Sequence, residues 1–267
     1  MSALPSILAV TFVLACATAG ADDERPAAPP RDPFSPAERT ALRDRFERDA
    51  AQLTRQITAQ PLEVELYSRR GDAHFFRGDF AAAVADYEKM VDLDPRTANS
   101  HWRRGIAWFY QGNYKSAAHQ FEIYHTFDDV DRENGIWRYL SQVKSLGVEP
   151  ARAAMLKYKK DDREPFRDVY RLFAAETTSE QILSRIAATD ASREEKNRRL
   201  FYAHLYVGLN DVIMNRPADA RKNLRLAVTN PWAEPAGYGP AFMWHVARLQ
   251  YELLDAPPKL RPDAEPK

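Results

Sequence analysis

Six histidines are the first candidates for chemistry, because imidazole is a common zinc ligand. They are His74, His101, His119, His125, His204 and His245. Zinc-binding helices usually carry two histidines four positions apart, on one face. No pair here has that spacing, and the single cysteine, Cys16, is isolated from them in the sequence. We therefore expect no metal site and interpret these histidines as packing or surface residues.

The acidic run Asp129-x-Asp131-x-Glu133 has the alternation of a calcium-binding loop. Such a loop needs glycine at its sixth position and glutamate at its twelfth. The glycine of this segment is Gly135, one position late, and the closing glutamate is absent. The sequence therefore predicts a solvated turn between two helices.

A second acidic group consists of Asp161, Asp162 and Glu164. Neighbouring carboxylates serve some enzymes as general acid and base. Scattered carboxylates on a turn do not define an active site, however, and the chain has no G-x-S-x-G motif. We expect a protein without catalytic residues or a cofactor, and an enzyme built on this group is the less favoured alternative.

The charge balance argues against nucleic-acid binding, because the 267 residues include 38 basic and 38 acidic side chains. One strongly charged stretch, residues 193–199, mixes both signs at helical spacing. That pattern is typical of a solvated helix face.

The N-terminal residues 1–21 carry no charged side chain. Residues 7–17 form an apolar run of the length found in signal peptides, and the alanines that follow suit a cleavage site. Cys16 ends the order Val-Leu-Ala-Cys, which resembles the lipobox of bacterial lipoproteins. Lipidation of Cys16 and its removal with a signal peptide are both open. We expect export to the periplasm, with a lipid anchor as the one possible link to the membrane.

The elements that must position any site follow from an internal repeat. Six pairs of similar residues lie 34 positions apart, and 34 is the period of the tetratricopeptide repeat (TPR). The pairs are Gly71 and Gly105, Gly78 and Gly112, Asp79 and Asn113, Phe80 and Tyr114, Ala83 and Ala117, and Tyr87 and Phe121. The spacing predicts helical hairpins over 64–97 and 98–131.

Small residues are expected where the two helices of each hairpin cross. Gly71 with Ala83, and Gly105 with Ala117, occupy those places, and Gly208 with Ala220 repeats the spacing in a third frame near 201–234. Gly78 and Gly112 follow the first helices, where a left-handed backbone suits glycine.

The remaining segments predict less regular helices. Residues 132–190 keep helical stripes, among them one at 151–158, but depart from the repeat signature. A capping box at Ser35 predicts a first helix, and apolar residues over 242–254 predict a last one that covers the final hairpin. The expected fold is an all-α, right-handed TPR solenoid over 35–255, between a proline-rich linker at 22–34 and a disordered tail at 256–267.

The order of these segments resembles the NlpI-like lipoproteins of the bacterial envelope. The resemblance covers residues 64–254 and rests on two regular repeats, an irregular helix pair, a long helix and a further repeat hairpin. It implies a non-enzymatic scaffold that binds envelope proteins or peptides, among them peptidoglycan enzymes and a processing protease. It also implies self-association, and a purely structural, self-associating envelope protein is the second alternative.

A binding surface is expected on the concave face, which the first helices of successive hairpins line. The 34-residue frame places four aromatic residues there as candidate peptide contacts: Phe75, Trp102, Phe109 and Tyr110. Aromatic side chains are the usual anchors of interfaces. The alternative is that these rings pack between neighbouring first helices. Ser68 and Asp72 occupy two positions where some TPR domains clamp a peptide carboxylate with lysine and asparagine, so that function is not expected.

Overall fold

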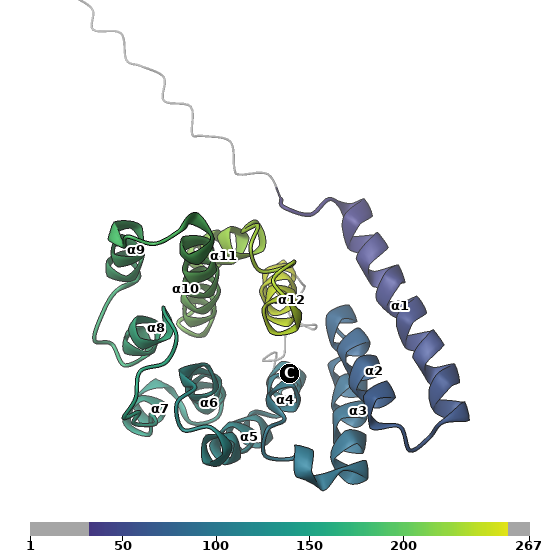
Figure 1. Cartoon of the computed structure of the whole chain (residues 1–267). Coiled ribbons are helices and arrows are strands. Elements are labelled where there is room, and N and C mark those ends of the chain that lie inside the picture. Colours follow the sequence, from purple (N-terminus) through teal and green to yellow (C-terminus); the bar gives the residue numbers. More distant parts are fainter. Residues whose placement is uncertain (1–31, 256–267) are drawn as a thin grey trace, which may run out of the picture. The chain divides into compact units, whose positions relative to one another are not determined.

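The computed structural model describes residues 32–255, in which all regular structure is helical (Figure 1). The predictions for the signal peptide, Cys16, most of the linker and the tail lie outside these residues. The helices are α1 (Pro36–Ala59), α2 (Val64–Arg77), α3 (Phe80–Leu93), a 3₁₀ turn at Pro95–Thr97, α4 (Trp102–Gln111), α5 (Tyr114–Phe127), α6 (Arg132–Leu146), α7 (Val148–Ala153), α8 (Phe166–Phe173), α9 (Ser179–Ala188), α10 (Arg193–Ile213), α11 (Pro217–Val228) and α12 (Tyr238–Leu253). No helix among the described residues is both long and apolar enough to cross a membrane. The predicted all-α solenoid of helical hairpins is confirmed.

The hairpins α2–α3 and α4–α5 follow the 34-residue frame. Gly78 and Gly112 end α2 and α4 in the left-handed conformation, with φ of 88° and 89°. Gly71 faces Tyr87 so closely that an added Cβ would lie 2.5 Å from its ring. Gly105 would meet Phe121 at 2.6 Å in the same way. In this fold these positions accept only glycine without movement of the ring opposite.

The third hairpin, α10–α11, repeats this close approach. A Cβ on Gly208 would lie 2.8 Å from Leu224, and Ala220 is fully buried, as are Ala83 and Ala117. The repeat-packing residues therefore lie at the helix crossings where the sequence places them.

The irregular middle contains less helix than its apolar stripes predict. The stripe at 151–158 is helical only to Ala153, and residues 154–165 form a loop. Seven of the twelve residues of this loop are charged, and Pro165 is its last residue. The loop is anchored by Tyr158, whose hydroxyl donates to the backbone carbonyl of Asp131 at 3.1 Å. It therefore lies over the start of α6.

The last helix has a second contact that the sequence did not predict. As expected, α12 packs on the final hairpin, where Trp244 Nε1 donates to the carbonyl of Val228 at 3.0 Å. On its other side it packs against α2, where the ring of Phe242 stacks on Phe75 at 4.9 Å. In Figure 1, α12 lies beside α11 and faces α2 and α4. The C-terminal helix thus contacts both ends of the solenoid.

The first helix secures this contact from outside. Ser35 and Glu38 form the predicted capping box at the start of α1. Phe46 of α1 then contacts both Phe76 of α2 and His245 of α12, with ring centroids 5.3 and 5.2 Å apart. Helices α1, α2 and α12 therefore pack as one unit.

Candidate functional site

The groove formed by the concave sides of α2 and α4, here called the N-terminal groove, is filled by α12. Phe242 of α12 is buried among rings of both helices, since it also meets Trp102 edge-on at 4.9 Å. Polar contacts add to the packing: Tyr238 donates to Asp72 at 2.6 Å, and Arg248 donates to the carbonyl of Phe76. The surface on which a partner peptide was expected is covered by the chain itself.

Three of the four candidate peptide contacts consequently lie in the core. Phe75 is fully buried, and Tyr110 and Phe109 are 2% and 6% exposed. Tyr110 stacks on Phe80 at 5.2 Å, and Phe109 meets Trp137 at 5.4 Å. The helical frame placed these rings on the concave side, but packing between neighbouring first helices and α12 leaves them no surface for a partner.

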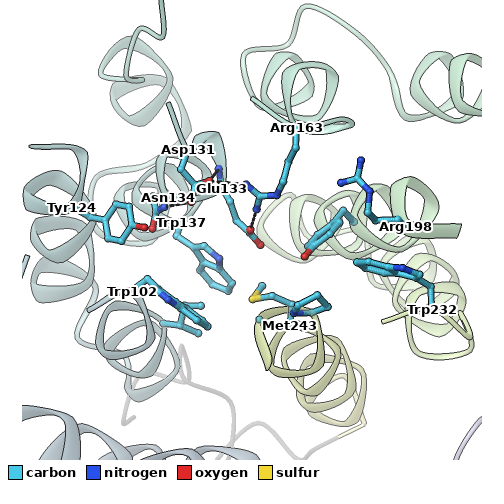
Figure 2. Close-up of a pocket in the computed structure, with 14 residues that line it drawn as sticks. Trp102, Tyr124, Asp131, Glu133, Asn134, Trp137, Arg163, Arg198, Trp232 and Met243 are labelled. Atoms are coloured by element: carbon cyan, nitrogen blue, oxygen red, sulfur yellow. Dashed lines mark hydrogen bonds and ion pairs between the residues drawn. The ribbon is translucent and has the colours of Figure 1, made fainter. Parts of the chain in front are cut away.

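Trp102, the fourth candidate, is only partly buried and lines a cavity of about 400 Å³, here called the central cavity. Its walls come from α4, α5, α6, α10 and α12 and from the loops before α8 and α12. The lining residues are Trp102, Ile106, Tyr124, Asp131, Glu133, Asn134, Trp137, Arg163, Arg198, Tyr202, Trp232, Gly239, Pro240 and Met243. Figure 2 shows Trp102 and Trp137 on one side of the cavity and Trp232 on the other.

One end of the cavity is charged. There the guanidinium of Arg163 pairs with Asp131 at 3.4 Å, with Asp162 at 3.2 Å and, at closer range, with Glu133. Glu133 also accepts a short hydrogen bond from the hydroxyl of Tyr206. We call Asp131, Glu133, Asp162 and Arg163 the charged end.

Local structure fixes the two carboxylates of α6. Asp131 is the N-cap of this helix and accepts from the backbone N–H of Glu133 at 3.0 Å and from Asn134 Nδ2 at 2.6 Å. Gly135, in the next turn, leaves room for the Tyr158 hydroxyl, which would collide with a Cβ there. The loop at 154–165 can therefore approach α6 and bring Arg163 to the carboxylates.

The electrostatics of the charged end reflect burial. Burial raises the pKa of Glu133 to about 7, and Asp131 and Asp162 add to this, whereas Arg163 and the Tyr206 hydrogen bond oppose it. Burial likewise raises the pKa of Asp131. Burial alone would lower the pKa of Arg163, but the three carboxylates raise it, so the guanidinium stays charged.

A second guanidinium, that of Arg198, lies on the Trp232 side of the cavity (Figure 2). It donates twice to Glu195, each bond 2.6 Å long, and Arg199 contacts the same carboxylate at 2.7 Å. Arg198 and Arg199 thus share one carboxylate, and the three groups together carry one positive charge.

Two interpretations of charged segments are corrected by this arrangement. The acidic run 129–133 is not a solvated turn throughout, because the Asp131 and Glu133 side chains are only 18% and 14% exposed. Residues 193–199 are not wholly a solvated face, since Arg198 lines the cavity. The loop at 154–165 covers the acidic run, and the loop before α12 lies beside residues 193–199, where Asn230 Nδ2 donates to the carbonyl of Asn197 at 2.9 Å. Trp137, four positions after Glu133, was the available signal that this face of α6 is buried.

The other predicted chemical groups have structural partners. Asp162 accepts from the backbone N–H of Arg132 at 3.0 Å, whereas Asp161 pairs with Arg132 and Arg167 at the surface. Glu164 is exposed. Within residues 32–255 no group of histidine, aspartate or glutamate side chains is arranged to hold a metal ion.

The two clamp positions are also occupied from within. Asp72 accepts from Arg103 at 2.7 Å, and Ser68 accepts from the same guanidinium at 3.0 Å. They are therefore part of the packing between α2 and α4.

Comparison with protein-family models identifies the hairpin α2–α3. Residues 64–97 match the model of the tetratricopeptide repeat. This segment is a TPR. The concave side of this TPR is the one on which α12 lies. A sequence comparison with curated proteins finds no match to the chain.

Proposed function

We propose that this protein is a non-enzymatic adaptor of the bacterial cell envelope that binds a segment of a partner protein in the central cavity. The TPR supports the general role, because such repeats commonly mediate protein–protein interactions. The envelope location rests on the signal-like residues 1–21 and on the resemblance to NlpI-like lipoproteins. That resemblance also suggests the partners: peptidoglycan enzymes or a processing protease.

The observation that carries the proposal is the aromatic lining of the cavity. Its volume falls in the range of about 300–1,000 Å³ that is usual for binding pockets, and five of its fourteen lining residues are aromatic: Trp102, Tyr124, Trp137, Tyr202 and Trp232. Trp137 is held in place by Phe109 and by a 3.2 Å hydrogen bond from Nε1 to Tyr206. Fixed aromatic walls of this kind bind a partner at low entropic cost.

The polar groups of the cavity favour binding over catalysis. Glu133 and Asp131 are each engaged by Arg163, and Asp131 also caps α6. The Asp131 carboxylate, which holds a helix end and an ion pair, is thus engaged in structural contacts. We therefore assign these residues to the architecture and the polarity of the cavity.

Site-specific photocrosslinking in the native host tests the proposal. A benzoylphenylalanine at position 232 replaces the partly buried Trp232 by another aromatic side chain inside the cavity. The matched control carries it at Leu62, which is 77% exposed in the turn between α1 and α2. We expect a crosslinked envelope protein at position 232 and not at position 62.

Two results would contradict the proposal. Absence of any adduct at position 232, or the same adducts at both positions, would move the binding surface away from the cavity. A product with twice the mass of the chain would instead indicate self-association and favour the structural alternative.

A further inference from the structure

We infer that the central cavity takes a cationic side chain, the ammonium of lysine or the guanidinium of arginine, from the bound partner. The inference rests on the proposed function, in which a partner segment enters the cavity. It concerns the chemistry that the charged end and the aromatic walls recognise together.

The charged end has more negative than positive charge. Asp131, Glu133 and Asp162 surround the single guanidinium of Arg163, so two carboxylate charges are uncompensated when all three groups are ionised. Arg198, the other guanidinium of the lining, lies on the Trp232 side and shares Glu195 with Arg199, so that side has one positive charge in excess. An anionic ligand would therefore be repelled by Glu133 and Asp131, whereas a cation would compensate them.

The walls suit the same ligand. Trp102 and Trp137 lie on one side of the cavity and Trp232 on the other (Figure 2). The faces of such rings attract ammonium and guanidinium groups, and the aliphatic stem of lysine or arginine packs well on apolar surface. Helices α4 and α12 contribute only uncharged residues, among them Ile106, Pro240 and Met243. A neutral apolar ligand would fill this part but leave the carboxylates uncompensated.

Binding should depend on pH through Glu133. Burial raises its pKa to about 7, so near neutral pH the group is partly protonated. The groups that face it are Arg163 and Asp162 from the loop, Asp131 from its own helix, and Tyr202 and Tyr206 from α10. A bound cation favours the ionised form, so affinity for it should rise up to about tenfold from pH 6 to pH 8.

The test uses the full chain labelled with ¹⁵N at its five tryptophans. Three indoles, those of Trp102, Trp137 and Trp232, line the cavity, and those of Trp108 and Trp244 lie outside it as internal controls. The probes are the Nα-acetyl methylamides of lysine, norleucine and glutamate, which share an aliphatic stem and differ in charge. We expect the lysine probe to shift the three cavity signals alone, with a dissociation constant at least fivefold below that of norleucine.

Two variants change the charge in opposite directions. Glu133→Gln should weaken binding of the lysine probe at least fivefold and leave the norleucine probe unchanged. Arg198→Gln should strengthen lysine binding, and Glu195 keeps Arg199 as its partner in this variant. If Glu133→Gln does not fold, the inference is tested by lysine binding to Arg198→Gln and by the pH dependence of lysine binding to the parent.

Equal binding of lysine and norleucine, preference for glutamate, or no shift with the lysine probe would overturn the inference. Because crosslinking at position 232 does not depend on the charge of the ligand, the adaptor proposal would stand or fall separately.

Discussion

Removing the ring of Phe242 tests whether α12 fills the N-terminal groove. This side chain is 1% exposed and contacts the rings of Phe75, Phe76 and Trp102. Truncation of a buried phenylalanine to alanine costs about 3–5 kcal/mol, because apolar burial is lost and a cavity remains. For a chain of this size each kcal/mol lowers the melting temperature by about 2–4 °C, so Phe242→Ala should melt about 6–20 °C below the parent.

Thermal unfolding followed by circular dichroism measures this difference. The matched control is Phe127→Ala at the end of α5, where the ring is 64% exposed, and its stability should change by no more than about 0.5 kcal/mol. If Phe242→Ala has the same melting temperature as the control variant, the ring is not buried in the groove, and the N-terminal groove is again a candidate surface for partners.

Three further predictions follow from named contacts. Gly105→Leu should lower the free energy of unfolding by about 1–3 kcal/mol, because its Cβ would lie 2.6 Å from Phe121. Gly239→Ala is the control, since no atom lies within 4 Å of its new Cβ, and its stability should not fall. Chemical denaturation compares the two variants. The folded pKa of Glu133 lies above its unfolded value, so the folded state binds more protons between these values. The stability of the parent relative to Glu133→Gln should therefore fall, on the order of 1–3 kcal/mol, as pH rises from about 4.5 to 7. Chemical denaturation of both proteins at several pH values measures this, and an equal dependence of the two unfolding free energies on pH would refute it. Finally, intact mass of the protein from its native host should show either loss of a signal peptide within residues 1–21 or an acylated Cys16, and an unprocessed N-terminus would exclude the envelope proposal.

The fold could be predicted because its determinants are local and repeated. Gly71, Gly105 and Gly208 each accommodate a bulky residue of the following helix, and this requirement is written at fixed spacing in the sequence. The start of α1 could be predicted in the same way, since Ser35 and Glu38 lie three positions apart and form its capping box by themselves. Such signals need no knowledge of the tertiary structure.

The site could not be predicted, because distant segments build it. The hydrogen bond from Tyr238 to Asp72 joins residues 166 positions apart, and no periodicity of the sequence predicts that contact. Arg163 reaches Glu133 from a loop 30 positions away, and the acidic run, which has the composition of a surface turn, becomes a partly buried cluster. Composition alone favours solvent for both segments, and tertiary packing overrides that preference.

The position of α12 links the covered N-terminal groove to the central cavity. The concave side of the N-terminal hairpins presents the rings of Phe75 and Trp102, and α12 covers both with Phe242. The same helix then supplies Gly239, Pro240 and Met243 to the central cavity, whose opposite walls belong to α6 and α10. The residue that closes one binding surface is thus carried by the helix that forms another. Phe242→Ala should therefore disturb the cavity as well as the groove, and a partner that binds the cavity should in turn stabilise α12 against release from the groove.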